Sequence, residues 1–375
     1  MVPNLRFSYK GDWSKRKLNE ICLFFKGNGL SKSDLSNEGF PCILYGELYT
    51  TYKNEVISDI ISKTNTTLSN PFLSRNNDLI IPGSGEDPID IAVARAIYQN
   101  DIILGGDLNI LRPKSNVSAA FLSYQLNGVR RYDIAKKAQG KSIVHLHNSD
   151  LKEVLVSIPS YDEQLHIVKL LTKIDEMIET QSKIINDYKL LKKYITKSFI
   201  KQKGTSYLLS EIAELGRGRV ISSAEISKQK NPIYPVYSSQ TSNNGVMGYL
   251  DNYDYEGEYI TWTTDGANAG TVYYRNGKFN CTNVCGILKI KNGYDAYYIS
   301  NILNCYTKKY VSTNLANPKL MNNVMANIKI NLPSIERQKY FSNILKAIEY
   351  RVKIEQDIKL NLVKQKVFLL KNMFL

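Results

Sequence analysis

A long apolar repeat that occurs twice limits the possible folds of this chain more than any other feature. Residues 158–199 and 332–373 both begin with an apolar residue followed by Pro-Ser, at an offset of 174 positions. Proline in a first turn followed by acidic residues is typical of a helix start. Apolar residues then recur at steps of three and four without internal Gly or Pro, which predicts a long helix packed against another helix. The residues predicted to pack the helices together are Ile167, Leu171, Ile174, Ile178, Ile185, Phe341, Leu345, Ile348, Val352 and Leu362.

Neither helix can bury its apolar stripe alone, so we expect the two copies to form an antiparallel pair. The segments before the helices are also duplicated, because Leu18-Asn-Glu-Ile21 aligns with Leu209-Ser-Glu-Ile212 at an offset of 191. We therefore predict a mixed α/β (α+β) fold. It has two α/β domains separated by two long antiparallel coiled-coil helices, related by a pseudo-two-fold internal repeat.

Shorter elements are predicted inside each domain. Residues 17–24 predict a short amphipathic helix that ends near the Gly27-Asn-Gly29 turn. Residues 78–85 and 259–266 each read as an apolar strand that leads into a loop of small residues. Loops of that kind bring the backbone close to a ligand.

Composition narrows the class of protein. The chain has 375 residues, of which 43% are hydrophobic, enough for two domains and their connectors. A formal net charge of +14 favours a polyanionic partner, with nucleic acid ahead of an acidic protein face or a membrane surface. We find no apolar signal core and no run of the roughly 20 residues that span a bilayer, so we expect a cytoplasmic protein with no membrane partner. The five scattered cysteines suggest free thiols.

Two short motifs imitate those of an adenine methyltransferase. Phe25-Lys-Gly-Asn-Gly29 resembles a loop that holds S-adenosylmethionine, and Asn231-Pro-Ile-Tyr234 resembles the N-P-P-Y motif. However, Gly27 aligns with Gly218 in the duplicate, where the aromatic position is Gly216, so a helix-ending turn explains Gly27 better. The second motif lacks its central proline and lies about 200 residues away.

No other catalytic or metal site is predicted. His145 and His147 share a face of an expected strand, but no third ligand is near them in the sequence, so we do not predict a metal site there. We find no phosphate-binding loop, nucleophile elbow or nuclease cluster. We therefore expect no catalytic residue, no metal and no cofactor bound by this chain.

Polar loops and basic segments are better candidates, and the contact they favour is with DNA. Amide side chains can pair bidentately with adenine edges, while backbone, hydroxyl and basic groups hold phosphates. In the second domain the candidates are Tyr237, Ser239, Gln240, Asn243, Asn244, Thr264, Asn268 and Arg275. In the first domain they are Tyr45, Glu47, Arg75, Ser84, Arg95, Arg131, Lys136, Lys137 and Lys141. The alternative for the second-domain candidates is a polar hairpin that binds no partner. The alternative for the basic residues from Arg131 to Lys141 is a solvated helix face.

The combination of these segments resembles the specificity (S) subunit of Type I restriction-modification systems over essentially the full length. The resemblance rests on several segments together, and no single one is specific. They are Pro3-Asn-Leu-Arg-Phe7, the domain starts at residues 13–21 and 209–212, Gly83-Ser-Gly-Glu-Asp-Pro88, Tyr237-Ser-Ser-Gln240, the two Pro-Ser-x-acid-x-Gln helix openings and Leu369-Leu-Lys-Asn-Met-Phe374.

The resemblance implies target-recognition domains at residues 1–158 and 203–332 and long conserved-region helices at residues 159–202 and 333–375. Each domain would read one half of a bipartite site in double-stranded DNA. The helices would set the spacer and dock two methyltransferase (M) subunits, which bring S-adenosylmethionine. Restriction-motor (R) subunits would complete a complex that acts as an adenine-N6 DNA methyltransferase and Type I endonuclease. The chain itself would be a non-catalytic adaptor.

Two alternatives are a self-contained adenine-N6 DNA methyltransferase and a coiled-coil scaffold that does not bind DNA. The adaptor would need a partner subunit for DNA methylation, the methyltransferase would need only its cofactor, and the scaffold would not bind DNA.

Overall fold

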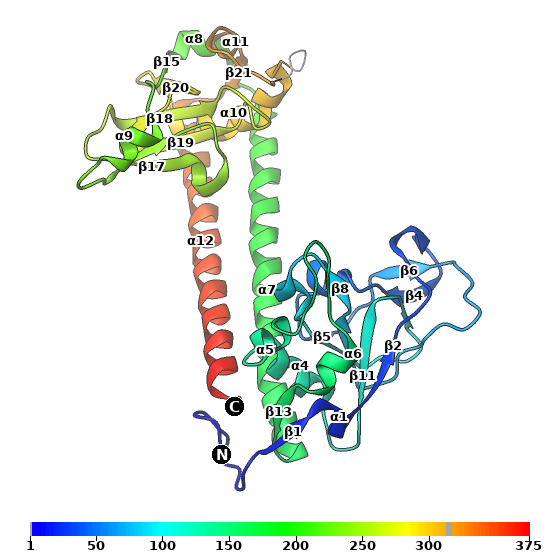
Figure 1. Cartoon of the computed structure of the whole chain (residues 1–375). Coiled ribbons are helices and arrows are strands. Elements are labelled where there is room, and N and C mark those ends of the chain that lie inside the picture. Colours follow the sequence, from blue (N-terminus) through cyan, green and yellow to red (C-terminus); the bar gives the residue numbers. More distant parts are fainter. Residues whose placement is uncertain (1, 313–316) are drawn as a thin grey trace. The chain divides into compact units, whose positions relative to one another are not determined.

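A computed structural model describes residues 2–312 and 317–375 (Figure 1). The chain divides into two compact units, the first made of residues 1–183 and 357–375 and the second of residues 184–356. Each unit is described by itself below. Within the described ranges, no helix is both long enough and apolar enough to cross a membrane.

The first unit is built on a five-stranded sheet in the order β2-β11-β7-β9-β5. Its strands are β2 (Cys22–Lys26), β5 (Val56–Ile57), β7 (Asp78–Pro82), β9 (Arg95–Ile97) and β11 (Leu108–Pro113). A four-stranded sheet follows the order β10-β4-β6-β3, with β3 (Leu35–Ser36), β4 (Phe40–Ile43), β6 (Ser62–Thr64) and β10 (Ile103–Leu104). Two small antiparallel pairs are β1 (Ser14–Lys17) with β13 (Leu155–Ile158), and β8 (Ser84–Gly85) with β12 (Val144–His145).

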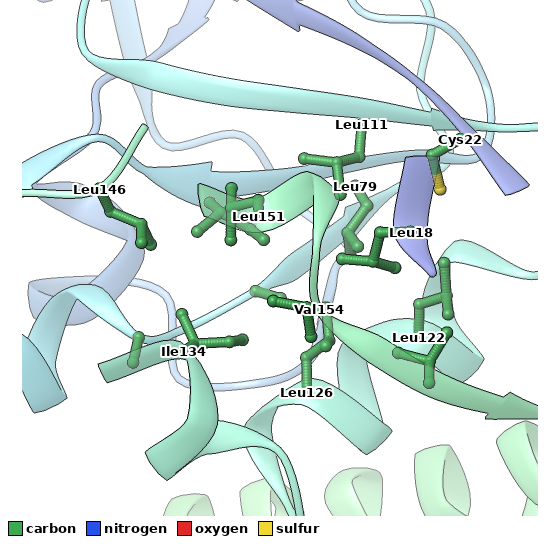
Figure 2. Packing of buried hydrophobic residues seen from close by; sticks show 14 of the residues in the cluster. Leu18, Cys22, Leu79, Leu111, Leu122, Leu126, Ile134, Leu146, Leu151 and Val154 are labelled. Atoms are coloured by element: carbon green, nitrogen blue, oxygen red, sulfur yellow. The ribbon is translucent and has the colours of Figure 1, made fainter. Parts of the chain in front are cut away.

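Short helices complete the first unit. They are α1 (Leu18–Ile21), η1 (Lys32–Asp34), α2 (Glu47–Thr50), α3 (Pro88–Ile91), α4 (Ala119–Asn127), α5 (Arg131–Ala135) and α6 (Asn148–Lys152). Every residue of the central strand β7 is buried, as expected for a strand covered on both faces. Figure 2 shows the core at this point, where Leu79 and Leu111 from the sheet meet Leu122 and Leu126 of α4.

The predicted helix over residues 17–24 is wrong in its second half. Only α1 is helical, and the chain then continues as β2, which pairs antiparallel with β11. Gly27 therefore follows a strand and does not end a helix. A Cβ atom on Gly27 would lie 2.0 Å from the carbonyl oxygen of Gly105, so close backbone packing requires glycine there.

The second unit is built on a six-stranded sheet in the order β15-β20-β18-β19-β16-β17. Its strands are β15 (Ala213–Arg217), β16 (Tyr234–Tyr237), β17 (Val246–Leu250), β18 (Tyr255–Thr263), β19 (Val272–Cys281) and β20 (Cys285–Ile290). The pair β14 (Thr205–Leu208) and β21 (Lys329–Leu332) is antiparallel. The helices are α8 (Leu209–Ile212), α9 (Ser223–Ser227), η2 (Ser242–Gly245), α10 (Ala296–Tyr306), η3 (Thr307–Tyr310) and α11 (Asn322–Ala326). Trp262 of β18 and Tyr298 of α10 are fully buried in its core.

The two units repeat the same opening. Strand β1, the four-residue helix α1 and strand β2 recur as β14, α8 and β15 at the offset of 191 expected from the sequence. Strand β13, the partner of β1, recurs as β21, the partner of β14, at the helix offset of 174. The glycines match as well, because a Cβ atom on Gly218 would lie 1.9 Å from the carbonyl oxygen of Cys281. The internal repeat is therefore present in the fold as well as in the sequence.

The repeated glutamine of the helix openings has a structural task in each unit. In the first, the Oε1 atom of Gln164 accepts a 2.9 Å hydrogen bond from the backbone N–H of Ser118, the N-cap residue of α4. In the second, Oε1 of Gln338 accepts a 3.0 Å bond from the backbone N–H of Asp295, the N-cap residue of α10. Both glutamines are buried. The motif thus fixes each long helix to the short helix of its own unit.

The long helices are α7 (Tyr161–Ile200) and α12 (Ile335–Asn372), and each contributes a part to both units. In the first unit, apolar residues of α7 share a cluster with Leu369 and Met373 of α12. In the second unit, the rings of Phe199 and Phe341 stack with centroids 3.7 Å apart, and Lys192 pairs with Glu349. Residue numbers rise along α7 as they fall along α12, so the helices pair antiparallel within each unit.

Candidate nucleic-acid interface

The strongest candidate contact surface in the second unit is the loop that follows β16. Residues 241–244 are exposed, and Asn243 and Asn244 both adopt left-handed backbone conformations, with φ values of 47° and 53°. Asparagine tolerates this region better than most residues, so the loop can present two amide side chains side by side. Gln240 is half-buried and donates through Nε2 to the carbonyl oxygen of Val246, which closes the loop.

The buried side chain of Arg275 supports this loop through a hydrogen bond to its backbone. Its Nη2 atom donates a 2.9 Å hydrogen bond to the carbonyl oxygen of Asn244, and its Nε atom donates a 3.1 Å bond to Oγ1 of Thr261. The guanidinium lies against the rings of Tyr237 and Tyr273, 3.5 Å and 4.4 Å from their centroids. Arg275 is only 3% exposed, and burial lowers its pKa. It supports the loop and does not offer a surface to phosphates.

The second polar loop of this unit divides into buried and exposed parts. Thr264 is fully buried, and its hydroxyl can donate to the carbonyl oxygen of Val284 or to the carboxylate of Asp265. Asn268 is exposed and donates a 3.2 Å hydrogen bond to Oγ1 of Thr241. The structure therefore brings Asn268 to the loop of residues 241–244 and withdraws Thr264 from solvent. Tyr237 and Ser239 are half-buried at the edge of the same loop.

In the first unit, Tyr45 and Glu47 line an open cavity of about 610 Å³. The cavity wall also contains Ser31, Lys32 and Asp107. Glu47 is held in place because one carboxylate oxygen accepts a 2.7 Å hydrogen bond from the backbone N–H of Leu44 and the other accepts from Ser62. A fixed carboxylate at the wall of a cavity can accept from a base amino group, such as the N4 donor of cytosine.

Two candidates of the first unit are buried, which the sequence pattern did not indicate. Ser84 is 4% exposed and its hydroxyl donates to Asp107, whereas Arg95 is 6% exposed and its Nε atom donates to the carbonyl oxygen of Leu48. Arg95 opens β9, which lies between β7 and β5 in the sheet. Burial gives both residues a structural task and leaves them no surface that DNA could contact.

The basic candidates of the first unit differ in how far their side chains are exposed to solvent. Arg75, Lys136 and Lys141 are exposed, while Lys137 is half-buried. Arg131 is also half-buried and donates a 3.0 Å hydrogen bond to the carbonyl oxygen of Ile89. Arg131 thus ties α5 to α3, and the three exposed cations remain available for phosphate contact.

The predicted helix-packing residues are buried with two exceptions. The two exceptions, Ile178 and Val352, are half-buried. The buried ones are Ile167, Leu171, Ile174, Ile185, Phe341, Leu345, Ile348 and Leu362. Their partners are not only the other long helix, because Phe121 and Tyr124 of α4 lie in the same cluster as Ile167 and Leu171.

A buried charged cluster in the first unit was not foreseen from the sequence. Nζ of Lys366 on α12 lies 2.6 Å from a carboxylate oxygen of Glu55 and 2.6 Å from one of Asp175 on α7. The hydroxyl of Tyr124 on α4 donates a 2.7 Å hydrogen bond to the second oxygen of Asp175. These residues are far apart in the sequence and each stands alone in its own segment, so no local motif could reveal the cluster.

The two motifs that imitate a cofactor site lie in separate parts of the fold. Phe25 and Gly27 lie in and after β2, while Asn231 donates its backbone N–H to Asp251 ahead of β16. The two motifs belong to different compact units. The rings of His145 and His147 are parallel with centroids 6.1 Å apart, and within residues 2–312 and 317–375 no cluster of three potential metal ligands occurs.

Comparison with known proteins decides the family. The sequence profile of the Type I restriction modification DNA specificity domain matches residues 10–189 and matches again over residues 204–365. The chain belongs to this family. The double match agrees with the two target-recognition domains expected from the repeat, and the chain is a Type I restriction-modification specificity subunit.

Relatives of known family support this membership, and a solved structure shares the fold. The chain is 44% identical over 142 residues to a putative type I specificity subunit N-terminus of Mycoplasma pneumoniae, covering 37% of this chain and 75% of that protein. It is 42% identical over 146 residues to the type I restriction enzyme MpnII specificity subunit of the same organism, covering 38% of this chain and 43% of that protein. The chain thus spans less than half the length of several relatives it matches. A crystal structure of a Type-I restriction-modification system S subunit from M. genitalium has the same fold, with a TM-score of 0.67 at 17% identity, covering 100% of this chain and 99% of that one.

Proposed function

We propose that each domain of this specificity subunit reads one half of a bipartite site in double-stranded DNA. The observation that carries the proposal is the repeat itself, in which one scaffold presents two different polar surfaces. In the second unit, the exposed Asn243, Asn244 and Asn268 offer amide groups of the kind that pair with adenine edges. In the first unit, Tyr45 and Glu47 offer a phenol and a fixed carboxylate at a cavity wall.

The partners in this proposal are two methyltransferase (M) subunits and restriction-motor (R) subunits. The long helices support protein docking because they leave large apolar side chains exposed after their own pairing, such as Tyr194 at 75% and Val367 at 60% exposure. Exposed apolar side chains that gather on one element are typical of protein interfaces. The same helices would set the spacer between the two half-sites.

The chemistry in this proposal belongs to the partners. The M subunits would bind S-adenosylmethionine and transfer its methyl group to N6 of adenine, and the R subunits would cut unmodified DNA. This chain would bind DNA, orient it and hold the M subunits, without binding a cofactor.

The experiment is a reconstitution. The purified chain, the cognate M subunit and their mixture are each incubated with plasmid DNA and labelled S-adenosylmethionine, and cofactor binding by the chain alone is measured by isothermal titration. We expect methylation only from the mixture and no cofactor binding by the chain. Stoichiometric cofactor binding or methylation by the chain alone would instead favour a self-contained methyltransferase. A chain that binds neither DNA nor M subunits would favour a scaffold.

A further inference from the structure

The second unit contains a basic groove that none of the DNA candidates above includes. It is an open hollow of about 470 Å³ between the C-terminal part of α7 and the end of α10. We call it the lysine groove, and its lining residues are Lys189, Lys192, Lys193, Thr196, Lys197, Asn301, Asn304, Cys305 and Lys308. All of them lie in the second unit.

The charge of the lysine groove is largely uncompensated. Lys192 pairs with Glu349. The other four lysines, Lys189, Lys193, Lys197 and Lys308, are exposed and make no ion pair within the part of the chain that the structure describes. A concentration of cations with so few paired acids is unfavourable for the free protein and attracts a polyanion.

The spacing of three of these lysines suits a phosphate backbone. Lys189, Lys193 and Lys197 follow one another at four-residue steps on one face of α7, and each step advances about 6 Å along the helix. Two nucleotides of one DNA strand rise about 6.8 Å, so successive lysines can meet alternate phosphates of one strand.

The other residues of the groove favour DNA over a protein partner. Asn301 and Asn304 are polar groups of the kind that contact phosphate oxygens, whereas Thr196 is buried and its hydroxyl donates to the carbonyl oxygen of Lys192. Protein interfaces are depleted in lysine and enriched in aromatic residues, and none of the described residues that line this groove is aromatic. Protein–DNA interfaces are in contrast polar and strongly positive.

We propose that the lysine groove binds the phosphate backbone of double-stranded DNA without reading its sequence. The inference rests on the proposed DNA-binding function and adds a site to it. The groove would raise the affinity for any DNA duplex, while the loops of the recognition domains would select the sequence.

The first test is the salt dependence of duplex binding by the full chain. The variant K189Q/K193Q/K197Q removes three charges from the groove, and K169Q/K173Q/K183Q removes three exposed charges from the other half of the same helix. The slope of log K against log salt falls by about 0.9 for each phosphate that the protein ceases to neutralise. We expect the groove variant to lower the slope by about 2 to 3, equally on cognate and unrelated duplexes, while the control keeps its slope. The variant K189R/K193R/K197R should retain wild-type binding, because it keeps the charge.

The second test uses Cys305, which is exposed in the groove while the other four cysteines are buried. A bound duplex should slow alkylation of Cys305 by a small maleimide, and added salt should remove that protection. Unchanged slope and unchanged alkylation would overturn the proposal for the groove alone. Protection by the M subunit but not by DNA would overturn it in favour of a protein interface. A wild-type chain without any affinity for DNA would overturn the proposed function together with this inference.

Discussion

The Cζ atom of Arg275 lies 3.5 Å from the centroid of the Tyr237 ring, beneath the loop that presents Asn243 and Asn244. The guanidinium is buried and forms no ion pair with a carboxylate of the described residues, so the tyrosine faces and two hydrogen bonds replace its lost hydration. Arg275 is therefore a positioning residue for the loop, which it reaches through the carbonyl group of Asn244.

Arg275→Lys should separate positioning from charge. Lysine keeps the charge but cannot donate from Nε and Nη2 at once or stack a planar group on two rings. We expect weaker and less selective recognition of the half-site read by the second domain. Recognition of the other half-site should be unchanged. Methylation of paired oligonucleotides that differ in one half-site measures both effects, and equal loss of selectivity at both halves would contradict the assignment.

Lys366→Met tests the buried cluster of the first unit. The substitution leaves Glu55 and Asp175 buried without their shared cation, and breaking a buried ion pair in this way costs about 3 to 5 kcal/mol of unfolding free energy. Lys173→Met is the matched control, since its pair with Glu176 is exposed and should contribute under about 1 kcal/mol. Urea unfolding of both variants provides the comparison, and equal losses would show that the cluster has no special role.

Asp175→Asn tests the pH dependence of the same cluster. Burial raises the pKa of Asp175, although Lys366 and Tyr124 oppose the shift. A carboxyl group with a raised folded-state pKa contributes stability that is present in full below its unfolded pKa of about 3.9 and is lost as pH rises through the folded-state pKa. The unfolding free energy of the variant relative to wild type should therefore increase as pH rises above about 3.9. The opposite trend would mean that the attraction of Lys366 outweighs burial.

The long helices allow a direct test of the spacer. Insertion of seven residues after Lys183 and after Gln356, at the boundaries of the compact units, keeps the contacts inside each unit and the apolar period. A copy of residues 177–183 and one of residues 350–356 serve as the insertions. Each helix grows by about 10 Å, so the preferred spacer should lengthen by about three base pairs.

The insertion in one helix alone is the control, because it mismatches the pairing and should destabilise the chain. Sequencing of methylated sites gives the preferred spacer of each variant. An active double-insertion variant with the original spacer would show that the helices do not set it.

The sequence was most informative where the physical signal is long or repeated. The two helices have an apolar period sustained over about 40 residues, and the duplicate supports each assignment with an independent copy. Residues 22–26 were harder, because a run of five residues beside a four-residue helix is too short for the helical and strand periods to differ.

The candidate site was predictable only in part. The amide loop at residues 240–244 has a local signature of small and polar residues, so it could be found from the sequence alone. The burial of Arg95 and Arg275 could not, because it depends on neighbours such as Leu48 and Asn244 that are distant in the chain. Arginine is usually exposed, and an interior arginine has no local pattern.

Independent reading of the two half-sites can be tested by methylome sequencing of cells that express the chain with its M subunit, in wild-type form and as N243G/N244G. Glycine keeps the left-handed backbone of both residues while removing their amides. We predict one bipartite motif for wild type, and for the variant a change confined to one half-site with the other half and the spacer preserved. A contiguous motif in wild type, or a change in both halves in the variant, would contradict the claim that each domain reads its own half of the site.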